Sequence, residues 1–156
     1  MRQTYKEHRV LLMASVIFSV LSSFAISFIA FALKYDAKWA KIPISLLFWL
    51  GLIGEQVCFW LANSILKKLL PTIKIRFNPK PGLISPFSTS MGAIADIVFV
   101  VSFIAFIIFC IFNIGKDNIQ YIFLFLLVLS FRLHCILNGK NFWYSNLLSR
   151  RDKRHG

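Results

Sequence analysis

Four long apolar stretches occupy most of the chain, at about residues 10–33, 42–66, 92–115 and 119–138. Each is about 20 residues long, the length that an α-helix needs to cross the hydrocarbon core of a bilayer. A helix satisfies its own backbone hydrogen bonds, as any segment inside lipid must. The pattern therefore predicts an all-α polytopic membrane protein, with residues 1–156 forming a single domain of four transmembrane helices.

The connections between the apolar stretches predict how the helices are paired. Short polar segments follow the first and third stretches, at residues 34–41 and 116–118, so each should close an antiparallel hairpin. Pro43 is expected in the first turn of the second helix, where a missing backbone donor costs little. The loop 67–91 is rich in proline, and the tail 139–156, which begins near an aromatic trio and ends in basic residues, should run along the membrane surface.

Basic residues are concentrated on one predicted side of the membrane. The net charge is +12, and most Lys and Arg residues precede the first helix or lie in the loop 67–91 and in the tail. By the positive-inside rule, this loop and both termini face the cytoplasm, an asymmetry that best fits a bacterial plasma membrane. We expect these residues to contact anionic headgroups, and their dispersal along the chain argues against nucleic acid as a partner.

Small residues recur at helical spacing in the first two predicted helices. In the first helix they are Ser15, Ser19, Ser23 and Ser27; in the second they are Gly51, Gly54, Cys58 and Ala62, close to Glu55. Residues four apart share a helix face, and small side chains there let another helix approach closely. We expect these faces to be packed against protein.

Six polar residues in or near the spans are the candidate intramembrane site. They are Glu55, Gln56, Asp96, Arg132, His134 and Asn138. Counting from the predicted helix ends places Asp96, Arg132 and His134 at similar depth and Glu55 nearer the midplane. This predicts an ion pair between Arg132 and Asp96, with His134 and Asn138 as further partners. Arg132 would reach Glu55 instead if the helices are staggered.

Two interpretations of this site remain open. The polar residues either lock the helices together, as paired intramembrane charges usually do, or leave Glu55 as a desolvated carboxyl that exchanges protons or holds a cation. His134 beside Cys135 does not have the spacing of a metal site, so neither a metal nor a cofactor is predicted. The three cysteines lie in apolar spans without a CxxC pair.

Motifs for enzyme chemistry are absent from the sequence. It contains no nucleotide-binding glycine loop, HExxH or GxSxG. The leading hypothesis is therefore a small non-enzymatic membrane protein that works through helix–helix contacts, as an accessory, regulatory or immunity-type partner of another membrane component or through self-association. The alternative is an oligomeric proton- or cation-coupled transporter or channel that uses Glu55. A hydrolase would require Asp96 and Glu55 to reach one water-accessible cavity.

Overall fold

The structure is a computed structural model that describes residues 2–36, 38–72, 89–112, 118–139 and 141–145. Its long helices are α1 (Arg2–Lys34), α2 (Lys38–Thr72), α3 (Ser90–Ile111) and α4 (Ile119–Leu137). A short helical turn follows at residues 141–145. All four long helices are long and apolar enough to cross a membrane, which confirms the predicted all-α fold with four spans.

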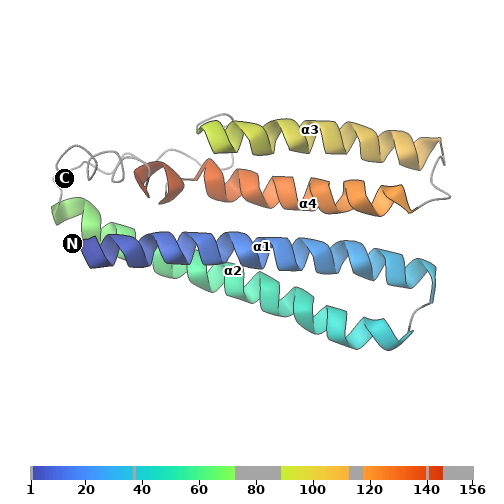
Figure 1. Cartoon of the computed structure of the whole chain (residues 1–156), viewed down its shortest axis with the longest axis horizontal. Helices are drawn as coiled ribbons and strands as arrows, with labels where there is room; N and C mark the ends of the chain where they lie inside the picture. The colour runs from blue at the N-terminus through green and yellow to red at the C-terminus, as the bar shows by residue number, and fades with distance from the viewer. Residues whose placement is uncertain (1, 37, 73–88, 113–117, 140, 146–156) are drawn as a thin grey trace.

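The helices form two antiparallel hairpins that lie side by side (Figure 1). Helix α1 packs against α2, α3 packs against α4, and the hairpins meet where α1 contacts α4. Thus α1 and α4 are central, whereas α2 and α3 are outer helices whose backbones do not approach each other. Below, the terminal end is the end at which α1 begins and α4 finishes, and the hairpin end is the opposite one (Figure 1).

The two hairpins differ in length. Helices α1 and α2 have 33 and 35 residues, whereas α3 and α4 have 22 and 19. At about 1.5 Å per residue the first hairpin is about 50 Å long, while the second matches a hydrocarbon core of about 30 Å. The first hairpin therefore extends past the second at the terminal end (Figure 1).

Several predicted helix boundaries need correction. Helix α1 begins at Arg2 rather than near residue 10, and α2 runs from Lys38 to Thr72 rather than over 42–66. Hydropathy marks only the part of a helix inside hydrocarbon, and the polar ends of both helices continue in helical conformation. Pro43 thus lies beyond the first turn of α2, and α3 ends at Ile111, before the predicted residue 115.

The predicted connecting segments lie partly outside the described residues. The loop predicted at 67–91 begins with helix, because α2 continues to Thr72, and its residues 73–88 lie outside the described part. The tail predicted at 139–156 contains the helical turn 141–145, and its last described residue is Ser145. Tyr5 of α1 donates a hydrogen bond to the Ser145 carbonyl at 3.1 Å, which fixes this turn against the start of α1.

Small residues bring α1 and α2 into close contact, as predicted. Ser15, Ser19, Ser23 and Ser27 are all buried. A Cβ atom added to Gly51 of α2 would lie 2.8 Å from the Ser22 Cβ atom and 3.0 Å from the Phe18 carbonyl oxygen. The absence of a side chain at Gly51 therefore sets the distance between the two backbones.

Polar contacts hold the ends of the helices together. At the terminal end, the Thr89 hydroxyl accepts a hydrogen bond from the Gly92 amide at 2.9 Å, which caps α3, and lies 3.1 Å from the Leu137 carbonyl of α4, to which it donates. At the hairpin end, the Tyr35 hydroxyl donates to Asn118 Oδ1 at 2.7 Å and so joins the two hairpins. Asn118 adopts a left-handed backbone conformation, with φ of 60°.

Candidate intramembrane polar site

Helix α4 supplies polar side chains to two separate clusters. Arg132 and His134 are two residues apart, which is about 200° around a helix with 3.6 residues per turn, so they leave α4 on nearly opposite sides. Asn138 follows His134 by four residues and shares its face. Because α1 and α3 contact different parts of α4, Arg132 is directed to the first hairpin and the other two residues to α3.

The first cluster joins three helices and is called the Arg132 cluster below; it consists of Ser22, Glu55 and Arg132. The Arg132 guanidinium forms an ion pair with the Glu55 carboxylate of α2 and donates a hydrogen bond to the Ser22 hydroxyl of α1. Ser22 in turn donates to the Phe18 carbonyl at 2.9 Å. Glu55 is only 7% exposed. The charge of each partner is thus compensated where hydration is largely excluded.

The second cluster lies within the second hairpin and is called the Asp96 cluster; it consists of Asp96, His134 and Asn138. Asn138 Nδ2 lies 3.2 Å from each oxygen of the Asp96 carboxylate and 3.0 Å from His134 Nδ1. His134 Nδ1 also contacts the carboxylate. Asp96 and Asn138 are buried. This cluster fixes the terminal half of α3 against the last turn of α4.

Gly92 makes room for the Asp96 cluster. It precedes Asp96 by one helical turn, and a Cβ atom at this position would overlap the side-chain amide of Asn138. Only a residue without a side chain therefore allows Asn138 to reach across to α3. Sequence analysis did not identify Gly92 or Ser22. Ser22 follows Ser19 by three residues, a spacing that places both on one helix face and could have identified Ser22 as part of the buried serine face.

The predicted ion pair between Arg132 and Asp96 is wrong, because Arg132 pairs with Glu55 and Asp96 contacts His134. Glu55 therefore has a charged partner, whereas the predicted depths left it without one. The depth count measured each residue from the end of its own helix. Since the first hairpin extends past the second, equal counts do not correspond to equal levels in the two hairpins.

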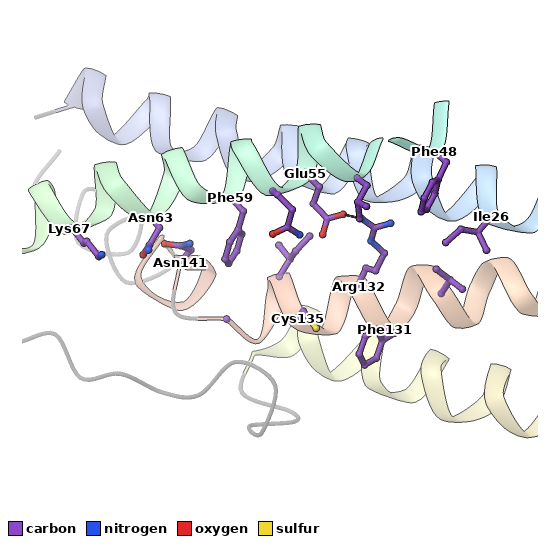
Figure 2. A pocket seen from close by; sticks show the side chains of 15 residues that line it. Ile26, Phe48, Glu55, Phe59, Asn63, Lys67, Phe131, Arg132, Cys135 and Asn141 are labelled. Carbon is purple, nitrogen blue, oxygen red and sulfur yellow. Dashed lines mark hydrogen bonds and ion pairs between the residues drawn. The ribbon is translucent and has the colours of Figure 1, made fainter. Parts of the chain in front are cut away.

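A cavity of about 930 Å³ lies between α2 and α4, beside the Arg132 cluster. Its wall at the level of the ion pair is called the inner groove: Ile26, Phe48, Leu52, Glu55, Gln56, Val128, Phe131 and Arg132. Toward the terminal end it continues past Phe59 to the groove mouth, formed by Asn63, Lys67 and Asn141. Figure 2 shows the mouth residues gathered at one end, away from Glu55 and Arg132.

Gln56 is the one predicted site residue that joins neither cluster. It lines the cavity and is exposed on α2, although it lies beside Glu55 in the sequence. Its amide makes no hydrogen bond to any residue in the part of the chain that the structure describes. The inner groove therefore presents both an unused amide and the edge of an ion pair.

The arrangement does not assemble the residues needed for two-carboxylate chemistry. Asp96 and Glu55 belong to separate clusters on opposite sides of α4, and Asp96 does not line the cavity. Within the described ranges, no group of three or more His, Cys, Asp or Glu residues is placed to hold a metal ion. The cysteines Cys58, Cys110 and Cys135 are free thiols.

The geometry is consequently that of a polar seam between apolar helices, with a lateral cavity beside it. Comparisons of the chain with protein-family models, with characterised proteins and with solved structures found no match.

Proposed function

We propose that this chain is a small non-enzymatic integral membrane protein that works by helix–helix contacts, with a helix of another membrane protein or of a second copy seated in the inner groove. Gln56 is the observation that carries the proposal. It lines the cavity as an exposed residue and lies next to the buried Glu55, well inside the span Ile42–Leu69. Its unused amide would be costly against lipid tails, which offer no hydrogen bonds.

A partner helix would satisfy this amide. Hydrogen bonds of Gln side chains between helices in membranes contribute about 1–2 kcal/mol in model peptides. The apolar side chains Phe48, Leu52 and Phe131 would supply the surrounding packing surface. The role that fits such a contact is accessory, regulatory or immunity-type, because the chain would act on the state of its partner.

We propose that the protein lies in a bacterial plasma membrane and that its terminal end faces the cytoplasm. Lys6, Arg9, Lys67 and Lys68 are exposed at this end, where the first hairpin extends past the second. Anionic headgroups on the cytoplasmic face would attract these cations. The uneven distribution of basic residues along the whole sequence supports the same orientation.

Site-specific photocrosslinking in native membranes tests the helix-contact proposal. A photoreactive residue at Leu52 or Phe59, which line the cavity, should give one defined adduct, whereas one at exposed Ile53, which does not line it, should give none. Gln56→Leu should reduce the adduct about fivefold through loss of the interhelical hydrogen bond. Two differently tagged copies reveal whether the adduct is a homodimer. Equal adducts at Leu52 and Ile53, or none at Leu52 and Phe59, would contradict the proposal.

A proton- or cation-coupled transporter is the second candidate, because the Glu55 carboxylate lines the cavity. The Arg132 ion pair argues against it, since a carboxylate that is already compensated attracts a further cation weakly. A proteoliposome flux assay with wild-type protein and Glu55→Gln separates the candidates. Flux in the wild type that Glu55→Gln abolishes would favour transport, and wild-type vesicles without flux would exclude it for the ion tested.

A further inference from the structure

Gln56 interrupts an outer surface that is otherwise free of polar side chains. Every other exposed side chain is apolar, aromatic or a thiol over the apolar parts of the four helices, residues 10–33, 46–66, 91–111 and 119–137. Helix α3 is the useful comparison, because it is also an outer helix and exposes no amide or charged group between residues 91 and 111. The outer surface of α3 therefore suits lipid tails, whereas that of α2 carries one neutral amide that lipid tails cannot satisfy.

Gln56 belongs to a row of α2 residues that line the cavity, called the Gln56 stripe below. It consists of Phe48, Leu52, Gln56, Phe59 and Asn63, which follow one another at intervals of four, four, three and four residues (Figure 2). Intervals of three and four place side chains on one side of a helix and are typical of two helices packed nearly parallel. Within the described ranges the backbone of α2 approaches only α1, so no other helix lies along the stripe.

The charges beside the stripe are balanced within the chain. Glu55 and Arg132 form an ion pair, so the inner groove has no net charge that a partner must compensate. The group that remains is the Gln56 amide, which has two N–H donors and a carbonyl acceptor. A neutral group that both donates and accepts hydrogen bonds is complementary to a copy of itself. The chemistry of the groove therefore favours an identical helix over a partner that carries a charge.

We propose that the helix seated in the inner groove is α2 of a second copy of this chain, which makes the protein a two-fold symmetric dimer. The inference rests on the helix contact proposed above and names its partner. Both copies enter the membrane in the same orientation, so the two-fold axis is parallel to the membrane normal and each residue lies at the same depth as its symmetry mate. Gln56 then meets Gln56 of the second copy, and each amide donates a hydrogen bond to the carbonyl of the other. Leu52 and Phe59 pack against their mates on either side of this pair.

Purified chain in phosphatidylcholine vesicles tests the dimer in the absence of any other protein. One sample carries a donor fluorophore at its N-terminus and another an acceptor, and energy transfer between them measures the dissociation constant of the dimer. Gln56→Leu should raise this constant about 25-fold, because each of the two lost hydrogen bonds contributes about fivefold. Gln56→Asn keeps an amide and should raise the constant less than Gln56→Leu does.

Single cysteines show which side of α2 faces the second copy. In a chain whose three native cysteines are replaced by alanine, Leu52→Cys places one thiol on each side of the two-fold axis, and copper phenanthroline should oxidise the two thiols to a disulfide. Leu50→Cys is the matched control. Leu50 is exposed at nearly the same depth but does not line the cavity, and it lies about 200° around the helix from Leu52. It should give no disulfide-linked dimer.

Three results would overturn the dimer. They are the absence of energy transfer between wild-type chains, equal dissociation constants for the wild type and Gln56→Leu, and equal disulfide formation at positions 50 and 52. A photoadduct at Leu52 that contains a different protein would also overturn the second copy as the partner, but it would leave the proposed helix contact intact. No photoadduct at Leu52 or Phe59 would remove the helix contact itself, so the two failures are distinguishable.

Discussion

The two polar clusters of α4 contain similar residues but join different parts of the molecule. The Asp96 cluster links residues 38 and 42 positions apart within one hairpin. The Arg132 cluster links residues 77 and 110 positions apart and connects both helices of the first hairpin to the second. One cluster therefore stabilises a hairpin, whereas the other stabilises the association of two hairpins. Of the two clusters, only the Arg132 cluster reaches the cavity, through Glu55 and Arg132, so the two faces of α4 have separate roles.

Removal of one charge from the Arg132 cluster should lower the free energy of unfolding more than any change to the Asp96 cluster. Glu55→Leu leaves the largely buried Arg132 without its counter-charge, which should lower the free energy of unfolding by about 3–5 kcal/mol. Unfolding in mixed micelles of mild detergent and dodecyl sulfate, followed by circular dichroism, measures this change. The double variant Glu55→Leu with Arg132→Leu should recover most of the loss. A double variant as unstable as the sum of its parts would show that the two residues do not act as a pair.

Filling the space at Gly92 should have an intermediate effect, confined to the second hairpin. The added methyl group of Gly92→Ala overlaps the Asn138 side chain, and overpacking of this kind costs about 1–3 kcal/mol. The same unfolding assay measures this loss in the free energy of unfolding.

Asn138→Ala provides the control for Gly92→Ala. It removes the overlapping atoms, so the costs of the two substitutions should not add, whereas Gly92→Ala and Glu55→Leu should be additive because they affect different clusters. Additive costs for Gly92→Ala and Asn138→Ala would mean that their contact does not determine the packing of α3 on α4.

The smallest effect is expected at the hairpin end, where the hairpins are joined by an exposed hydrogen bond. Tyr35→Phe removes the donor to Asn118 and should cost about 0.5 kcal/mol, since water replaces the lost partner. Tyr121→Phe is the matched control, because the Tyr121 hydroxyl makes no hydrogen bond within the described residues. If Tyr35→Phe lowered the free energy of unfolding as much as Glu55→Leu does, the Arg132 cluster would not be the main junction of the two hairpins.

The main features of the fold could be predicted because they depend on local sequence. Hydropathy identified the four spans, and the four-residue spacing of serines in α1 identified a buried face. The helix ends were less accurate, because hydropathy marks apolar residues, whereas polar residues beyond them form helix as readily as turns. The extension of α1 to Arg2 and of α2 to Thr72 lies in such sequence.

The pairing within the site could not be predicted in the same way. The spacing of Arg132 and His134 shows that they leave α4 in opposite directions, but not which helix lies on either side. That depends on the contact of α1 with α4 and on the unequal hairpin lengths, which are properties of the whole molecule. The role of Gly92 could not be predicted either, because it depends on the side-chain amide of Asn138, which belongs to another helix.

The separation of Glu55 and Arg132 in the sequence has a consequence for biosynthesis. The ribosome adds about 5–20 residues per second, so Arg132, which follows Glu55 by 77 positions, is made about 4–15 s later. Throughout that interval the first hairpin holds a carboxyl group whose counter-charge does not yet exist. A chain that stops before α4 therefore keeps the Glu55 carboxyl without its counter-charge, and this buried, uncompensated group distinguishes an unfinished chain from the finished protein.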